Sequence, residues 1–367
     1  MLLKSKDASV LSASAYDKLL HGGWFRGARF MNKPDFICAS GGLFSPVHIR
    51  LSLENHVPRK SHTKMMRKND AEFKCIITPA IVDNRAEWLY QQQKENFQAF
   101  IYPSLDEAIF TVDDPNSFRT FSIRVFDGEK LIATSFFDVG ADSMASLLGL
   151  YDKNYSSKSL GSYTILKEIE FAQSLGLKFF YPGYVLDDMK VFGYKLEYGK
   201  FDFKAPDGKW KQISKYDRSK TRTAYLKQNF QLLVDWLTKN NMVGRVKTYP
   251  LHYAYNPKLD QSQFYKYPLY YEMIVNGERH AASFDPEKKT YVWSQIVKSP
   301  LHNRLLAGLE ISDDLQNGRT YEMNLLETVR EIHLPMELID KLQISNTTPT
   351  GQWSDPITSL RMKASFK

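Results

Sequence analysis

The residues most able to take part in chemistry lie where an apolar strand is followed by a helix near the middle of the chain. The pattern predicts a strand over residues 143–151 and a helix over residues 160–176, and the polar loop between them carries Lys153 and Lys158. The first turn of a helix has free backbone N–H groups and the positive end of the helix dipole. A helix that begins at Gly161 can therefore bind a phosphate or a developing oxyanion. The alternative is an ordinary strand-to-helix turn that needs a small residue.

A second candidate site is a basic segment over residues 56–69, which contains five Lys or Arg and no acidic residue. Cationic side chains of this kind contact nucleic-acid phosphates without reading the sequence. The net charge of the chain, +8, is compatible with a polyanionic partner. A simple solvated surface is the alternative for these five side chains, Arg59, Lys60, Lys64, Arg67 and Lys68.

A mixed sheet must position these candidates. Apolar and alternating patterns predict strands at 47–53, 73–79 and 178–184, and the Asp127-Gly128 turn predicts a hairpin over 121–139. Helical spacing predicts a helix over 83–99, and Asp187 can cap a short helix over 187–195. Together with the strand and helix described above, this order indicates an α+β fold.

A different composition begins near Lys211. The pattern predicts a helix over 215–240 with Leu226, Phe230, Leu233 and Trp236 on one face, three strands over 273–296, a helix over 321–342 and a loose segment over 345–360. The Tyr-rich stretch 252–271 can form an interface or a core, and its alternative is stacking on unpaired bases.

Length and composition exclude several classes of protein. The 367 residues correspond to two domains, or to one core domain with a long extension. Apolar residues at 43% and charged residues at 25% exclude a disordered or fibrous chain. No apolar run is long enough to span a membrane, and the first residues do not form a signal peptide. The chain has only two cysteines, Cys38 and Cys75, which excludes a disulfide scaffold. We therefore expect a cytoplasmic protein. We also expect no metal site.

The central segment resembles the C-terminal half of the arginyl- and leucyl-tRNA–protein transferases. In that family, a Y-D pair is followed by S-L-G-T-Y-x-I-L, then by E-I, G-Y and Y-K. This chain has Tyr151-Asp152, Ser159-Leu160-Gly161-Ser162-Tyr163, Ile165-Leu166, Glu168-Ile169, Gly183-Tyr184 and Tyr194-Lys195.

The N-terminal half supports the same resemblance. The family has Y-D, G-W-x-R and R/K-P in order, and then a basic segment that ends in Asn. Here the matching residues are Tyr16-Asp17, Gly23-Trp24-Phe25-Arg26, Lys33-Pro34 and the segment 58–69. The resemblance covers residues 14–212, and no single motif in it is specific by itself.

The chain also departs from the family pattern. The family's N-terminal cysteine cluster is reduced to Cys38, so we expect no metal cluster. The R-H…G-G-M stretch expected after Tyr90 and the C-P-K-M run before Tyr194 are both replaced. These changes put the choice of donor and acceptor, and activity itself, in doubt.

The resemblance implies a GNAT-like acyltransferase core with a small N-terminal subdomain. We expect a subdomain at 14–78, a GNAT-like domain at 79–212 and a C-terminal α+β extension of unknown role at 213–367. The implied activity is transfer of arginine or leucine from aminoacyl-tRNA onto the N-terminal α-amine of an acceptor protein, in the N-end rule pathway. The expected acceptors begin with Asp or Glu, and no cofactor is expected.

The resemblance also implies site residues. Tyr194, Lys195 and Glu168 are expected at the reacting centre; a solvated position is the alternative for Lys195 and Glu168. The basic segment is expected to bind tRNA. The substrate-binding residues are expected to be Trp24, Arg26, Lys158, Gly161, Ser162, Tyr163, Gly183 and Tyr184, with a core position as the alternative for Trp24 and Tyr163.

Two other functions remain open at this stage. One is an acyl-CoA-dependent N-acetyltransferase of the same fold, although Tyr163 stands where its pyrophosphate loop would need a small residue. The other is a non-catalytic relative that binds tRNA or a partner. Donor choice is also open, but Phe25 beside Arg26 and the missing cysteine cluster favour leucine.

Overall fold

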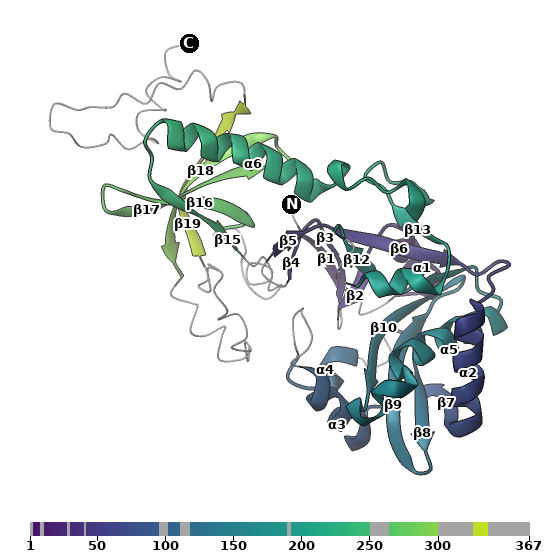
Figure 1. Cartoon of the computed structure of the whole chain (residues 1–367). Coiled ribbons are helices and arrows are strands. Elements are labelled where there is room, and N and C mark those ends of the chain that lie inside the picture. The colour runs from purple at the N-terminus through teal and green to yellow at the C-terminus, as the bar shows by residue number, and fades with distance from the viewer. Residues whose placement is uncertain are drawn as a thin grey trace, which may run out of the picture. The chain divides into compact units, whose positions relative to one another are not determined.

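The computed structural model describes residues 3–7, 11–27, 30–39, 42–94, 102–110, 118–188, 192–249, 264–299 and 326–336 (Figure 1). The chain divides into two compact units. We call residues 3–34 and 46–217 the N-terminal unit, and residues 35–45 together with the chain from Arg218 onward the C-terminal unit.

The N-terminal unit is built on a nine-stranded mixed sheet. Its order is β14-β13-β6-β11-β10-β9-β8-β7, and β12 also pairs with β6. The strands are β6 (Pro46–Ser52), β7 (Lys74–Pro79), β8 (Thr120–Asp127), β9 (Lys130–Val139), β10 (Ser143–Tyr151), β11 (Phe179–Tyr181), β12 (Tyr184–Leu186), β13 (Phe201–Lys204) and β14 (Trp210–Gln212). The strands predicted over 47–53, 73–79 and 143–151 and the β8–β9 hairpin are confirmed, and Gly128 has the positive φ, +58°, that its turn requires. The single strand predicted over 178–184 is instead two short strands, β11 and β12, because the chain turns at Gly183 with φ +89°.

Helices cover this sheet and bury its apolar side chains. Helix α5 (Leu160–Ser174) packs on β9 and β10, and α2 (Lys60–Glu72) packs beside α5 (Figure 1). A separate apolar cluster joins the sheet to α3 (Asn84–Gln93) and α4 (Leu105–Ile109). The predicted helices over 160–176 and 83–99 are therefore present, although α3 ends earlier and residues 95–99 lie outside the described residues.

A small antiparallel sheet precedes the large one. Its order is β1-β3-β2, with β1 (Leu3–Asp7), β2 (Phe25–Gly27) and β3 (Phe30–Pro34). Helix α1 (Ala13–His21) carries Asp17, whose carboxylate accepts hydrogen bonds from the backbone N–H groups of Ala141 and Asp142 at 2.9 and 2.8 Å. The Tyr-Asp motif of the sequence thus fixes the turn between β9 and β10.

One helix was predicted with the wrong bounds and type. In place of a helix over 187–195 capped by Asp187, the structure has a short 3-10 helix, η3 (Gly193–Tyr198), that begins after Phe192 at φ +63°. Asp187 is buried at the end of the preceding segment, and residues 189–191 lie outside the described residues. This later start places both Tyr194 and Lys195 in the first turn of η3.

The C-terminal unit combines one long helix with an antiparallel sheet of order β15-β16-β17-β18-β19. Leu226, Phe230, Leu233 and Leu237 of α6 (Arg222–Lys239) are buried, while Trp236 is only half-buried. The strands are β15 (Gly244–Thr248), β16 (Leu269–Val275), β17 (Glu278–Asp285), β18 (Thr290–Lys298) and β19 (Leu326–Pro335), and a hairpin joins β4 (Ile37–Ala39) to β5 (Gly42–Phe44).

The helix predicted over 321–342 is wrong, because its described part is strand β19. Leu326, Val329 and Ile332 are apolar and recur every three residues, a spacing that predicts a helix. Cross-strand pairing with β18, from Leu326 opposite Lys298 to Pro335 opposite Thr290, prevails over that local pattern. Residues 345–360 lie outside the described residues.

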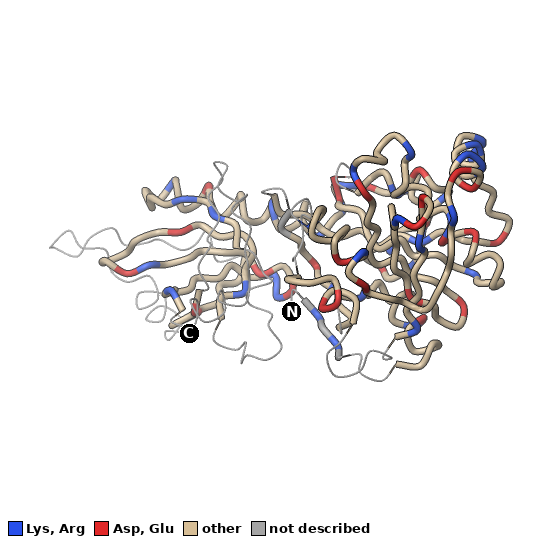
Figure 2. Tube along the Cα trace, turned by 90° about the horizontal axis from the view of Figure 1, so that it is seen from below, with Lys and Arg blue, Asp and Glu red and all other residues tan. Residues whose placement is uncertain are grey.

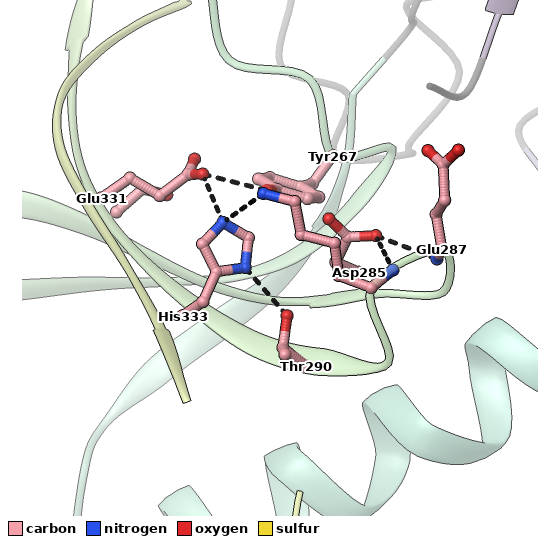
Figure 3. Close-up of polar contacts among 8 residues, drawn as sticks. Tyr267, Asp285, Glu287, Thr290, Glu331 and His333 are labelled. Atoms are coloured by element: carbon pink, nitrogen blue, oxygen red, sulfur yellow. Dashed lines mark hydrogen bonds and ion pairs between the residues drawn. The ribbon is translucent and has the colours of Figure 1, made fainter. Parts of the chain in front are cut away.

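Polar side chains on β17, β18 and β19 form a connected network in this unit (Figure 3). Glu331 accepts a hydrogen bond from the Tyr267 hydroxyl at 3.1 Å and bonds the imidazole Nε2 of His333 at 2.9 Å. The other ring nitrogen of His333 lies 2.8 Å from the Thr290 hydroxyl. Within the described part of the Tyr-rich stretch, Tyr265, Tyr267, Tyr270 and Tyr271 are buried, as the core alternative expects.

Candidate functional site

The site begins where two neighbouring strands separate. Strands β10 and β11 are parallel and pair only from Ser143 opposite Phe179 to Ala145 opposite Tyr181. Beyond Ala145, β10 continues to Tyr151 while the chain after β11 turns at Gly183 to pair with β6 instead. Residues Ser146 to Leu148 of β10 are partly exposed at this point, and Gly149 is exposed. The separated strands therefore leave an accessible strand edge in the middle of a sheet.

A buried carboxyl group lies beside this edge. Glu168 of α5 has no solvent exposure, and neither of its carboxyl oxygens has a hydrogen-bond partner within the described residues. Burial raises the pKa of Glu168 to about 8, and the neighbouring hydroxyls of Ser135 and Ser146 offset this only in part. A solvated position for Glu168 is excluded, and at neutral pH the carboxyl group is mostly protonated.

Two tyrosines of η3 lie near this carboxyl group. Burial of its hydroxyl raises the pKa of Tyr194, and Tyr151 and Glu168 raise it further. The ring of Tyr194 is nevertheless about half exposed. The Tyr198 hydroxyl donates a hydrogen bond to the Ser162 hydroxyl at 3.1 Å. We call Glu168, Ser162, Tyr194 and Tyr198 the acid cluster.

Lys195 contacts Gly183, Tyr184 and Phe192. We call these four residues the lysine cluster. The Lys195 ammonium donates a hydrogen bond to the Tyr184 carbonyl at 3.2 Å and lies 4.9 Å from the centre of the Phe192 ring. Burial lowers the pKa of Lys195 to about 8. Gly183 has φ +89°, and a β-carbon there would lie 3.4 Å from the ammonium. Glycine is thus required for the backbone conformation of the turn, while a β-carbon there would only touch the Lys195 ammonium.

The start of α5 lies between these clusters and α2. Ser159 precedes the helix at φ +54° and makes no side-chain cap, so no side chain of the described structure caps the first N–H groups. Gly161 has only the ring of Tyr151 near its missing β-carbon, at 3.6 Å. Lys158 is held by Glu72 of α2, with one carboxylate oxygen at 2.6 Å.

Three predicted site residues have contacts that are structural. Tyr163 is fully buried, and its hydroxyl donates to Asp70 of α2 at 2.6 Å. The buried Arg26 guanidinium donates to Asp138 at 2.7 Å and to the Thr120 hydroxyl at 2.9 Å. Trp24 packs beside the core of α1 and stays partly exposed. Tyr163 and Arg26 therefore brace the site, and the structure does not bring them to the acid cluster.

The basic segment forms one face of α2. Lys60, Lys64, Arg67 and Lys68 follow helical spacing, and they and Arg59 are exposed. The opposite face buries Met66 and Asn69, and the Asn69 amide donates to the Lys158 carbonyl at 3.0 Å. Figure 2 shows Lys and Arg positions in blue along the Cα trace of this helix. The segment thus presents a cationic face next to the start of α5.

The sequence did not indicate four residues that the structure brings into the site. Tyr198 lies one helical turn after Tyr194, and Ser135 and Ser146 are hydroxyls within otherwise apolar strands. A polar residue in an apolar run is the signal that could have identified these two. His48 of β6 lies 6.4 Å from Tyr184 between ring centres, and no local pattern marks it.

Comparison with known proteins shows which enzymes this chain resembles. The family model for the C terminus of arginine-tRNA-protein transferase matches residues 79–204. An aspartate/glutamate leucyltransferase of Leptospira interrogans serogroup Icterohaemorrhagiae is 24% identical over 180 residues, which are 46% of this chain and 68% of the relative. The enzyme of the same name from Helicobacter hepaticus is 26% identical over 197 residues, covering 52% and 80%.

A solved structure gives a weaker likeness. L-PGS from Bacillus licheniformis has 9% identity and a TM-score of 0.30, over 39% of this chain and 46% of that one. A TM-score this low does not establish a shared fold.

The family model and the named relatives define the chain as an acyltransferase. Residues 79–204 are similar to the C terminus of arginine-tRNA-protein transferase, and about half of the chain is similar to aspartate/glutamate leucyltransferases. No helix within the described ranges is long and apolar enough to cross a membrane.

Proposed function

We propose that the protein transfers leucine from charged tRNA onto the N-terminal α-amine of proteins that begin with Asp or Glu. The names of the relatives support this donor and these acceptors. The observation that carries the proposal is Glu168, a buried carboxyl group without a hydrogen-bond partner beside the separated strands. Such a group is costly unless a substrate or a reaction uses it.

We also propose a GNAT-like core for residues 79–212, a subdomain at 14–78 that carries the tRNA-binding face, and an extension at 213–367. The separation of β10 from β11 next to the start of α5 supports this division. No cofactor is required, because the ester of aminoacyl-tRNA is already activated.

The reaction needs three things from the protein. The amine nitrogen attacks the ester carbonyl carbon, the bond from that carbon to the ribose oxygen breaks, the amine loses a proton and the ribose oxygen gains one. The enzyme must align the reactants, stabilise the oxyanion and move these protons.

The two clusters can supply these requirements. An incoming ammonium group favours the carboxylate form of Glu168, which then accepts the proton of the amine. Lys195, with a pKa of about 8, is largely protonated at neutral pH and can donate a proton to the ribose oxygen. The uncapped N–H groups at Gly161 and Ser162 can bind the oxyanion, and Tyr194 can line the site.

A transfer assay tests the proposal. Leucyl-tRNA or arginyl-tRNA is incubated with the protein and with peptides that begin with Asp, Glu, Lys or Ala, and peptide mass is measured. We expect leucine on the Asp and Glu peptides. Arginine on the same peptides would correct the donor, and transfer to none of them with tRNA still bound would leave a non-catalytic relative.

A further inference from the structure

A group of lysines lies on one face of the small sheet, away from α2. Lys4 and Lys6 of β1 are both exposed and lie two residues apart, so they share a face. Lys4 stands directly opposite Lys33 of β3. Like charges in directly opposed positions destabilise a sheet. This arrangement therefore favours a bound anion.

Lys204 of β13 extends this positive region. Burial lowers the pKa of Lys204, and the charges of Lys33 and Arg50 lower it further. Asp207, whose charge raises the pKa of Lys204, pairs with Lys211 at 2.7 Å. We call Lys4, Lys6, Lys33 and Lys204 the lysine face.

Part of this arrangement has a structural explanation. The Lys33 ammonium donates to the Gly22 carbonyl at 2.6 Å, and the Trp210 indole donates to the His21 carbonyl at 3.1 Å. Both contacts satisfy carbonyls at the end of α1. They do not account for Lys4, Lys6 or Lys204.

Partly exposed indole rings alternate with these cations. The Lys6 ammonium lies 5.1 Å from the centre of the Trp24 ring. The Trp210 ring has two cations over it, the Lys204 ammonium at 5.2 Å and the Arg50 guanidinium at 4.4 Å. Proteins that bind single-stranded nucleic acid combine cations for the phosphates with aromatic rings for the bases. The lysine face and its two indoles have this composition.

The lysine face lies next to the lysine cluster. Tyr184, whose carbonyl accepts from Lys195, contacts the ring of His48, and Lys33 and Lys204 both lower the pKa of that buried imidazole. One layer of side chains therefore separates Lys195 from the lysine face. An Asp or Glu acceptor carries its carboxylate on the same residue as the reacting amine, so that carboxylate stays beside the reacting centre and the lysine face is left for the tRNA.

We propose that the lysine face binds the sugar-phosphate backbone of the unpaired 3′ end of tRNA, with Trp24 stacking on one of its bases. This inference rests on the proposed function. It assigns a second tRNA contact, separate from the cationic face of α2.

Binding measurements on the full chain test this assignment. The probes are an uncharged leucine tRNA and the same tRNA without its unpaired 3′ nucleotides, each titrated by fluorescence anisotropy over a range of salt concentrations. The variant is Lys4→Gln with Lys204→Gln, and the control is Lys239→Gln on the exposed end of α6. We expect the double variant to weaken binding of the intact tRNA on the order of tenfold and to lower the salt slope by about 1.4, which is two phosphate contacts to a single strand. Binding of the shortened tRNA should not change.

Other results would overturn the proposal. Equal losses on both probes would place the lysine face on the duplex. Unchanged tRNA binding with a raised KM for the Asp peptide would assign the face to the acidic acceptor. If the wild-type protein transfers leucine and the double variant binds tRNA normally, this inference alone is overturned. If the wild-type protein neither binds tRNA nor transfers leucine, the proposed function is overturned as well.

Discussion

The two units differ in the hydrogen bonding of one glutamate each, Glu331 and Glu168. Glu331 in the C-terminal unit bonds Tyr267, His333 and, at 3.4 Å, the Ser294 hydroxyl (Figure 3). Glu168 in the N-terminal unit is more deeply buried and has no such partner within the described residues. A satisfied network specifies and stabilises a fold, whereas an unsatisfied buried group costs stability. The contrast assigns stability to the first glutamate and chemistry to the second.

The largest effect is expected at Lys195. Replacement by Met removes the proton donor and should lower kcat by about 10²- to 10⁴-fold. Lys195→Arg keeps the charge but holds its proton too tightly to donate it, so it should not recover kcat. Single-turnover transfer from leucyl-tRNA measures this, and circular dichroism checks the fold. Normal turnover by Lys195→Met would remove Lys195 from the reaction.

Glu168→Gln should separate activity from stability. We expect a loss in kcat of about 10²-fold, together with a gain in stability at alkaline pH. The pKa of Glu168 is raised to about 8 in the folded state, so the folded protein binds more protons than the unfolded chain between about pH 4.5 and pH 8. The wild-type protein should therefore lose stability as pH rises through this window, by up to about 1.4 kcal/mol per pH unit.

The measurement is the melting temperature of wild type and variant from pH 5 to pH 8.5. Glu170→Gln is the control, because Glu170 lies on the same helix but is exposed and pairs with Lys167. A difference between wild type and Glu168→Gln that does not change with pH would show that folding does not shift the pKa of Glu168, which contradicts the raised pKa of the buried carboxyl group.

The two units also differ in how much of them the sequence predicts. Local signals predicted the Asp127-Gly128 hairpin, helix α5 and the three strands over 273–296, because turn chemistry and side-chain period determine them. Strand β19 was not predicted, because its pairing with β18 is a long-range contact that the local spacing of apolar residues does not show. In the site, motif order identified Glu168 and Lys195. The burial of Glu168 and the hydrogen bond from Tyr198 to Ser162 depend on packing between elements, which no local pattern contains.

Glu331→Ala should change stability in the opposite direction to Glu168→Gln. It removes the shared acceptor of Tyr267 and His333 and should lower the free energy of unfolding by about 1–3 kcal/mol. Transfer activity at low temperature should stay at the wild-type level. Chemical denaturation measures the first expectation, with Glu278→Ala, at an exposed position on β17, as the control. A stabilised variant would show that the two glutamates do not differ in the way we infer.

The smallest effect is expected on the cationic face of α2. Lys64 and Lys68 lie one helical turn apart, are exposed and have no ion pair within the described residues. Changing both to Gln should lower the salt slope of tRNA binding by about 1.8, which is two phosphate contacts to a duplex, with kcat unchanged at saturating tRNA. Both intact and shortened tRNA should respond equally, in contrast to the lysine face. A change in kcat with an unaltered salt slope would mean that α2 acts by supporting α5, through contacts such as that of Tyr163 with Asp70, and not by binding tRNA.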